Sequence, residues 1–404
     1  MIKTKVAIIG TAGVPARYGG FETLAHHLVD QMHADYDLTV YCSASYYHRD
    51  ERVKEFNGAK LVYVPLNANG LQSIFYDFIS IFHALRYADT LLILGVSGCI
   101  LLPFIKLFTR KKIIVNIDGM EWRREKWNWA VRKFLKLSEY CAVKFSDADI
   151  TDNAAIQRYT SIQYKTLSHM IAYGADHCSR EKISLTSYGK YEFLKNRYAF
   201  KVCRIEPENN IHLVLEAFAN FKTFPLVLVG NWDNSEYSRE LRKKYSKHSN
   251  LILLDPIYDQ RELNILRSNC TVYIHGHSAG GTNPSLVEAM FLGLPVFAFD
   301  VNFNRATTEN KARFFRSESE LLSLLQLVSE EELKVLAAAM ESIATKRYTW
   351  SAIANRYRFV INTSFEKRSV ESKVHAIPVH TAIRLGFRHL QQANFFEDRK
   401  VIRA

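Results

Sequence analysis

The stretch IIGTAGVPARYGGFETLAHHLV, residues 8–29, decides the fold, because it joins a strand pattern to a helix pattern through a glycine-rich loop. Its apolar start predicts a strand, and the amphipathic spacing after Gly20 predicts a helix. Gly10, Gly13, Gly19 and Gly20 stand within eleven residues. A turn alone seldom needs so many glycines. The pattern therefore favours a loop whose free N–H groups, with the positive end of the helix, bind phosphate or carboxylate.

The glycine spacing is neither the dinucleotide fingerprint nor a Walker loop, which would end in lysine and serine or threonine. Glu22 has a plainer interpretation as a first-turn carboxylate that complements the helix dipole. The residues of this loop that we expect to contact a ligand are Gly13, Arg17, Tyr18, Gly19, Gly20 and Glu22.

Short apolar runs alternate with helical patterns along the whole chain, which predicts parallel sheets flanked by helices. In the first half, strands are expected at residues 6–9, 38–41, 61–64, 91–94, 113–117 and 148–151. After a polar, irregular segment the alternation restarts with YAFKVCRI, FPLVLVG, NLILLD, TVYIHG and LPVFAFD. We therefore predict an α/β protein of two doubly wound domains, joined near residues 177–195. Ligands bind at the carboxyl ends of such strands, so the working cleft is expected between the domains.

Length and composition agree with this organisation. A chain of 404 residues is long enough for two cores. The formal net charge of +12 favours anionic partners. Six scattered cysteines without a C-x-x-C pair predict reduced, mostly buried thiols in a cytoplasmic protein. The apolar run at the N-terminus is too short for a signal peptide.

The segment TLLILGVSGCILLPFI, residues 90–105, is the one candidate for a membrane span. It is shorter than the roughly 20 residues that a span needs, and it carries two glycines and a proline. We expect a buried strand, a tight turn and the start of a buried helix.

A second glycine loop lies in HGHSAGGTNPSLVEAMFLGLPVFAFD, residues 275–300. Pro284 stands where a first helical turn begins, so Thr282 and Asn283 are expected at cap positions before it. Glu288 falls one turn into this helix. Its apolar flank favours a ligand-facing position at the edge of the core over a solvated one.

The segment KVCRIEPENN, residues 201–210, places Arg204 at a strand end. An arginine there can bind a diphosphate with two parallel hydrogen bonds. A pair with Glu206 or Glu208 is the alternative, and the sequence leaves both open.

Asp118 follows a strand and is expected to point at the cleft. The helix after it carries an apolar stripe of Trp127, Val131, Phe134, Leu137, Cys141 and Ala142. Residues 106–144 hold eleven Lys and Arg against four acidic residues, with three tryptophans between them. A solvated helix face explains such charge, and so does contact with an anionic membrane surface or lipid diphosphate.

No metal site is expected. The DAD of residues 147–149 resembles a metal-binding D-x-D, but acids in register are common by chance. No cysteine and histidine spacing fits zinc, and His26 and His27 are expected to face solvent or core. Nucleic-acid binding is not expected either, because no recognition module is present.

Six ordered motifs between Gly10 and Tyr357 resemble glycosyltransferase family 4, in its rhamnosyltransferase-like branch of bacterial polysaccharide assembly. They are GTAGVPARYGGFET, NIDGMEW, IAYGAD, RIEPENN, GGTNPSLVEAM and YTWSAIANRY. The resemblance implies the GT-B fold. It also implies an N-terminal domain over 1–185 on the acceptor side, a donor domain over 186–345, a crossover helix over 346–366 and a basic extension over 367–404.

The resemblance further implies a retaining transfer without an essential metal or other cofactor. Arg204 would neutralise the donor diphosphate, Glu288 would hold the nucleotide ribose, and Asp118 would orient the acceptor or sugar. The N-terminal loop would meet the acceptor and the transferring sugar. The donor-binding set comprises Gly280, Gly281, Thr282, Asn283, Asn209 and Gly230.

Two positions depart from the family pattern. Gly280 replaces the first of two glutamates, and Asn209 replaces a lysine five residues after Arg204. A deoxysugar such as rhamnose would lack a hydroxyl for that glutamate to hold.

The expected reaction moves a sugar, with dTDP-rhamnose as the expected donor, onto a polyprenyl-diphosphate-linked glycan of an O-antigen, capsule or exopolysaccharide. It would take place at the inner face of the cytoplasmic membrane, with residues 106–144 on the lipid surface. The alternatives are a nonenzymatic nucleotide- or glycan-binding subunit and a nucleotide-sugar epimerase of the same fold.

Overall fold

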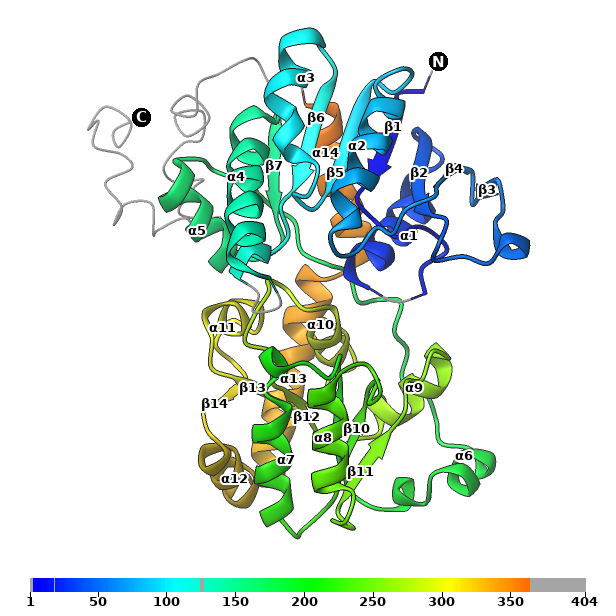
Figure 1. Cartoon of the computed structure of the whole chain (residues 1–404). Coiled ribbons are helices and arrows are strands. Elements are labelled where there is room, and N and C mark those ends of the chain that lie inside the picture. The colour runs from blue at the N-terminus through cyan, green and yellow to red at the C-terminus, as the bar shows by residue number, and fades with distance from the viewer. Residues whose placement is uncertain (1–2, 18, 124–126, 364–404) are drawn as a thin grey trace. The chain divides into compact units, whose positions relative to one another are not determined.

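The computed structural model describes residues 3–17, 19–123 and 127–363. The described residues form two compact units, one of those up to 172 together with 350–363 and the other of residues 173–349 (Figure 1). The predicted α/β class with two parallel-sheet domains is confirmed. The expected boundary after residue 185 was too late. The second unit begins at Tyr173, because the linker packs on this unit together with the strand that follows it. Arg180 donates to the Gly293 carbonyl there at 3.1 Å.

The first unit is built on an eight-stranded sheet in the order β3-β4-β2-β1-β5-β6-β7-β8. All pairs are parallel except β3 with β4. The strands are β1 (Lys5–Ile9), β2 (Asp37–Ser43), β3 (Glu55–Phe56), β4 (Ala59–Val64), β5 (Thr90–Leu94), β6 (Lys112–Asn116), β7 (Ala148–Thr151) and β8 (His169–Met170). The six predicted strands are all present. Two-residue strands such as β3 and β8 are too short to show a periodicity.

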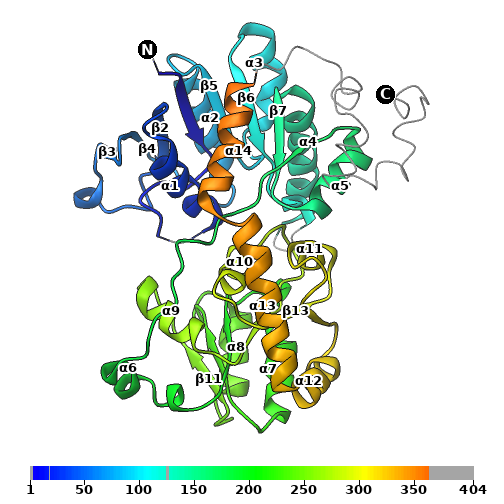
Figure 2. The ribbon, with the colours of Figure 1, turned by 180° about the vertical axis from the view of Figure 1, so that it is seen from behind.

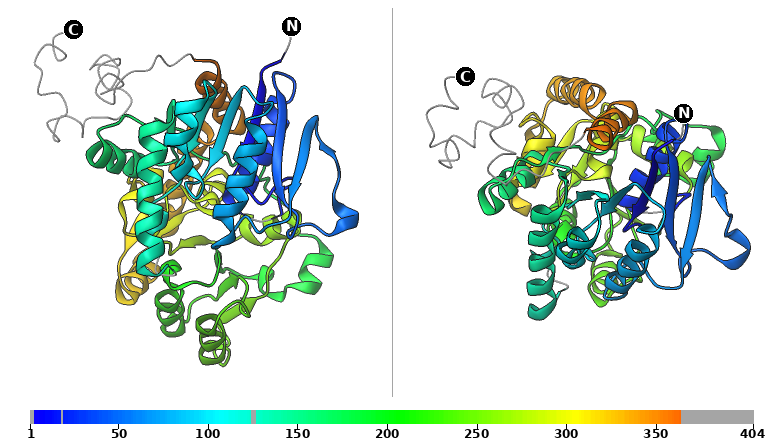
Figure 3. Two further views of the ribbon diagram at one scale, coloured as in Figure 1. Left: turned by 45° about the horizontal axis from the view of Figure 1, so that its top comes forward. Right: turned by 90° about the horizontal axis from the view of Figure 1, so that it is seen from above.

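Helices cover both faces of this sheet. The helices are α1 (Gly20–Met32), α2 (Gln72–Ala84), α3 (Leu102–Phe108), α4 (Trp129–Phe145), α5 (Ala154–Tyr164) and α14 (Trp350–Asn362). Helices α2, α3 and α4 share one hydrophobic core against the central strands. Helices α1 and α14 pack together on the opposite face, as Figures 2 and 3 show.

Helix α14 belongs to the first unit although it follows the second in sequence. The ring of His27 stacks on Trp350 with centroids 4.2 Å apart, and Tyr36 donates to Asn362 at 2.9 Å. The Lys112 ammonium on β6 donates to the carbonyls of Val360 and Ile361 at 2.7 and 2.6 Å. A crossover helix was predicted, but it begins at Trp350 instead of residue 346. The basic extension 367–404 lies outside the described residues.

The second unit has a six-stranded sheet in the order β11-β10-β9-β12-β13-β14, parallel throughout. Its strands are β9 (Ala199–Val202), β10 (Leu226–Val229), β11 (Leu251–Leu254), β12 (Val272–His275), β13 (Val296–Phe299) and β14 (Arg313–Phe315). Its helices are α6 (Leu185–Lys190), α7 (Ile211–Asn220), α8 (Glu236–Tyr245), α9 (Gln260–Ser268), α10 (Pro284–Phe291), α11 (Asn302–Thr307), α12 (Glu318–Leu327) and α13 (Glu330–Arg347). The five predicted strands are confirmed.

Each sheet has a point where the direction of winding reverses. In the first sheet it lies between β1 and β5, and in the second between β9 and β12. Open parallel sheets bind ligands outside the carboxyl ends of the strands at such points. The loops after β1, β5, β9 and β12 are therefore where ligand contacts are expected.

Residues 90–105 form strand β5, a turn and the start of α3, as predicted. None of the helices in the described part of the chain is long and apolar enough to cross a membrane. Helix α3 is not buried as expected, because only Leu102 and Ile105 face the core, while Phe104 is 63% exposed. Leu137, placed in the apolar stripe of α4, is 52% exposed as well. All six cysteines are buried and unpaired.

Candidate active site

The glycines of the loop after β1 are explained by close packing within the first unit. A Cβ on Gly10 would lie 2.0 Å from the Leu94 carbonyl oxygen, and one on Gly13 would lie 2.6 Å from the Cys42 sulfur. Both glycines have positive φ angles, which other residues rarely adopt. The expectation that so many glycines require a ligand is therefore not needed for these two.

Glu22 does more than complement the helix dipole. Its Oε1 accepts hydrogen bonds from the Ala12 amide at 2.7 Å and from the Thr11 hydroxyl at 3.3 Å. A Cβ on Gly19 would lie 1.9 Å from its other oxygen. Glu22 thus holds the two ends of the loop together, directly before the helix that starts at Gly20. Tyr18 lies outside the described residues.

Arg17 already has partners in the structure. Its guanidinium pairs with Glu51 at 2.6 Å, donates to the Tyr46 carbonyl at 3.2 Å and lies 5.0 Å from the centre of the Tyr47 ring. Its side chain is 39% exposed. A ligand contact by Arg17 would compete with these interactions.

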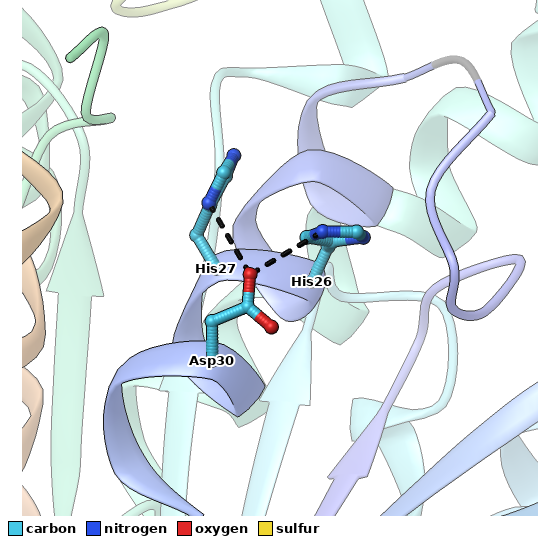
Figure 4. A group of neighbouring side chains, drawn as sticks. All are labelled: His26, His27 and Asp30. Carbon is cyan, nitrogen blue, oxygen red and sulfur yellow. Dashed lines mark ion pairs between the residues drawn. The ribbon is translucent and has the colours of Figure 1, made fainter. Parts of the chain in front are cut away.

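His26, His27 and Asp30 form a cluster on α1 (Figure 4). The Asp30 carboxylate lies 3.3 Å from His26 Nε2 and 3.8 Å from His27 Nδ1. The Ala16 amide donates to His26 Nδ1 at 3.2 Å. In the neutral ring this bond puts the proton on Nε2, so the nitrogen that faces Asp30 is a donor. The cluster therefore fits a hydrogen-bonded link between α1 and the loop better than a metal site.

Asp118 follows β6 in a left-handed conformation, with φ of 57°. Its amide donates to Asn116 Oδ1 at 3.0 Å, and the Asn116 amide donates to the Tyr357 hydroxyl at 2.9 Å. A non-glycine residue in this region costs roughly 1 kcal/mol or more, and such residues cluster at functional sites. The aspartates of the DAD segment, by contrast, have structural partners. Asp147 binds Lys106, and Asp149 accepts from Ser168 at 2.5 Å.

Arg204 follows β9 at the point where the second sheet reverses. Its guanidinium is 3.8 Å from Glu206, and its side chain is 47% exposed. The alternative pairing with Glu206 is therefore present but is longer than a hydrogen bond. Asn209 is buried and donates to the Arg204 carbonyl at 2.7 Å, so its amide shapes the turn. Gly230 has a packing reason, because its Cβ would lie 2.4 Å from Ile205.

The loop after β12 leads into the N-terminus of α10. Asn283 caps this helix, since its Oδ1 accepts from the Ser285 amide at 3.1 Å, and Pro284 is the first helical residue, as predicted. Gly280 has φ of 117°, and nothing lies within 4 Å of the Cβ that it lacks. Gly281 and Thr282 are buried. Gly280 thus leaves open space in the loop before α10.

Glu288 on α10 is held by two cationic side chains. One oxygen pairs with the Arg267 guanidinium, which is 2% exposed, and the other lies 3.3 Å from His177 Nε2. Burial alone would raise the pKa of Glu288, but the Arg267 charge and the His177 hydrogen bond lower it to about 2. Burial alone would lower the pKa of His177, but hydrogen bonds to Cys178 and Glu288 raise it to about 10. The carboxylate is therefore ionised near neutral pH and has lone pairs left for further hydrogen bonds.

His177, Cys178 and Glu288 have donor atoms close enough to hold a metal ion. Arg267 occupies this cluster as well, and its guanidinium lies 3.6 Å from the Cys178 sulfur. A permanent cation among the donors opposes binding of a second one. The residues fit an ion-pair network better than a metal site.

Sequence reasoning missed Arg267 and His177. The one available signal for Arg267 was the apolar pair Ile265 and Leu266 directly before it. A cavity of about 300 Å³ lies at the end of β11, lined by Lys190, Tyr191, Glu262 and residues 254–259. It contains none of the predicted site residues.

Comparisons with known proteins bear on both units. Residues 3–176 match a family described as a domain of unknown function, DUF1972, and residues 189–317 match the family described as glycosyl transferases group 1. No curated protein matches the sequence.

Solved structures share the fold at low identity. Sucrose-phosphate synthase from Thermosynechococcus elongatus superposes with a TM-score of 0.72 at 13% identity, over 90% of this chain and 100% of that one. Anabaena HepE in complex with UDP-glucose gives 0.67 at 14%, over 88% and 99%. The trehalose-6-phosphate synthase OtsA gives 0.67 at 10%, over 90% and 100%. With the GT-B fold of these enzymes and a glycosyl transferases group 1 domain, the protein is a glycosyltransferase.

Proposed function

We propose that the second unit binds a nucleotide sugar and that the enzyme transfers its sugar, with retention of configuration, to a lipid-linked glycan. The observation that carries this proposal is the set of anion-binding features where the second sheet reverses. Arg204 is half exposed there, and the capped N-terminus of α10 begins after an open glycine loop. The Anabaena HepE structures that contain UDP and UDP-glucose support a nucleotide-sugar donor.

As the glycosidic bond loosens, the leaving diphosphate gains negative charge. Arg204 and the amides of residues 281–283 would stabilise this charge, which is the kind of effect that usually contributes most to catalysis. The leaving phosphate would then take the proton of the acceptor hydroxyl. Asp118 would orient the acceptor or the sugar, and Glu288 would accept hydrogen bonds from the ribose. No step needs a metal or another cofactor.

The donor that we favour is dTDP-rhamnose. A glutamate side chain at position 280 would bind sugar hydroxyls, and rhamnose has one fewer of these than hexoses do. Gly280 instead leaves this position open. The family resemblance of the whole chain adds to this choice.

For the acceptor we propose a polyprenyl-diphosphate-linked glycan, reached from the inner face of the cytoplasmic membrane. The outer sides of α2 and α3 support contact with lipid. We define the α2–α3 apolar face as Leu71, Phe75, Ile79, Phe82, Phe104, Leu107 and Phe108, which are 48–83% exposed. Arg110 lies just after α3, and Lys133 and Lys144 lie on the neighbouring α4. These exposed cations would meet anionic lipid.

The test is incubation of the purified protein with a panel of nucleotide sugars and a polyprenyl-diphosphate-linked saccharide. We expect one donor to yield an extended lipid-linked product, with chelator present or absent. An isomerised donor formed without acceptor would instead indicate an epimerase. Donor binding without any product from the whole panel would favour a binding subunit.

A further inference from the structure

Two buried basic side chains lie together in the second unit, and neither has an oxygen or nitrogen partner among the described residues. Lys201 on β9 is 1% exposed and His275 on β12 is fully buried. Neither the Lys201 ammonium nor either nitrogen of His275 has an oxygen or nitrogen hydrogen-bond partner among the described residues, and the Cys203 thiol lies beside Lys201. Lys201 also has no ion pair in the part of the chain that the structure describes. Buried polar groups are normally paired, so the lack of partners for these two side chains needs an explanation.

Their position suggests that reason. The strands β9 and β12 are neighbours at the reversal of the second sheet, and both residues stand at the carboxyl ends. A Cβ on Gly276 would lie 2.9 Å from the Lys201 ammonium and 2.4 Å from the Asn209 carbonyl oxygen. The ammonium therefore lies directly beneath two loops, the loop after β9 that carries Arg204 and the glycine loop after β12.

These two loops are tied to one another. Asn210 donates to the Gly276 carbonyl at 2.9 Å, and the Ser278 amide donates to the Glu208 carbonyl at 2.8 Å. The rings of His275 and His277 stack with centroids 4.4 Å apart. The backbone of these two tied loops thus covers Lys201 and keeps its ammonium close beneath them.

No carboxylate pairs with the Lys201 ammonium among the described residues. Burial lowers the pKa of Lys201, and the Cys203 thiol beside it offsets this only in part. Burial and the nearby Lys201 lower the pKa of His275 well below its ordinary value, so this imidazole stays neutral. An anion bound above these two loops would supply the missing opposite charge, and in a poorly polarisable interior such attraction is strong.

We propose that Lys201 is the second positive charge that holds the donor diphosphate, acting from beneath the Gly276–Ser278 loop. Lys201 acts through its field and without touching the nucleotide, so it is a positioning residue. The inference rests on the proposed function.

The experiment compares the full-length wild type with Lys201→Met by calorimetry, using UDP and dTDP as probes and uridine and thymidine as uncharged counterparts. We expect Lys201→Met to weaken the nucleoside diphosphate that binds by tenfold or more and to leave nucleoside affinity within twofold. We also expect the free variant to melt at a higher temperature, because an unpaired buried charge is gone. Lys222→Met is the matched control, since this exposed lysine of the same unit lies at the opposite ends of the strands.

The other outcomes decide against the inference. Unchanged diphosphate affinity in Lys201→Met would overturn it while leaving the proposed function intact. A lower melting temperature with equal losses for diphosphate and nucleoside would indicate a purely structural lysine. A wild type that binds neither UDP nor dTDP would count against the proposed function itself, and with it the inference.

Discussion

Asp77 on α2 shows how far burial can shift the pKa of a single side chain. It is 2% exposed, and one carboxyl oxygen has no hydrogen-bond partner among the described residues. Burial raises its pKa to about 8, and a hydrogen bond from the Gly98 amide offsets only part of this. The folded protein therefore holds a proton that the unfolded chain releases above about pH 4.

The consequence is a stability that depends on pH. The contribution of Asp77 to the free energy of unfolding is full below about pH 4, falls as pH rises to about 8 and is constant above. Asp77→Asn removes this loss, so the variant should be more stable than the wild type at pH 8 by more than about 2 kcal/mol, with a smaller difference at pH 5. Urea unfolding at the two pH values measures it. Asp50→Asn, at an exposed aspartate, controls for the lost charge, and a difference that does not change with pH would contradict the prediction.

The ion pair of Glu288 and Arg267 makes a second prediction for a single residue. Arg267→Met should lower the free energy of unfolding of the second unit by about 3–5 kcal/mol, because it leaves a buried carboxylate with only His177 beside it. Arg261→Met on the same helix is the matched control. Arg261 is 81% exposed and 3.6 Å from Glu181, so its loss should cost less than about 1 kcal/mol. Denaturant unfolding measures both losses. Equal losses of unfolding free energy from the two substitutions would contradict this account.

Among the elements, α2 and α3 differ most from ordinary surface helices. Strands were readily predicted because their apolar runs are buried on both sides in parallel sheets. Helix faces were harder, since α2 buries the polar residues Ser73, Asp77 and Ser80, while the large apolar side chains of α2 and α3 that include Phe75, Phe82 and Phe104 face outward. Periodicity then cannot say which side is buried, and a helix start that looked fully buried carries exposed Phe104.

The α2–α3 apolar face makes a prediction about lipid contact. Replacing Phe75 and Phe82 by serine should reduce binding to vesicles of anionic lipid about tenfold or more, because two large apolar side chains no longer enter the interface. Stability should stay nearly unchanged, since the rings are 62% and 56% exposed. Co-sedimentation with the vesicles measures the effect. Phe359→Ser is the control, because this residue is 61% exposed on α14, across the sheet; an equal loss of binding there would argue against a specific face.

At the scale of the whole molecule, the chain leaves the first unit, builds the second and returns as α14. The return is fastened by Lys112, whose pKa is lowered by burial and which donates to the last carbonyls of α14. These carbonyls have no partner within the helix. The lysine thus stabilises the end of a helix that lies 248 residues further along the sequence.

Lys112→Met should therefore lower the free energy of unfolding of the first unit by about 1–3 kcal/mol, the cost of buried carbonyls left without donors. Urea unfolding followed by tryptophan fluorescence measures this loss. Lys60→Met removes an exposed lysine of the same sheet, 3.2 Å from Asp37, and should change stability by less than about 0.5 kcal/mol. A Lys112→Met variant as stable as that control would show that α14 is held by its apolar contacts alone.

The sequence by itself determined the α/β class, the two sheets, most strands, the cap before α10 and the chemistry of a glycosyltransferase, because these depend on local periodicity and short motifs. Only the tertiary structure decided what the loop glycines pack against, which cations hold Glu288 and that Lys201 is buried. Those contacts join segments far apart in the chain, such as residues 177, 267 and 288. No local pattern encodes them, since side chains from different strands and helices meet only after the sheet has formed.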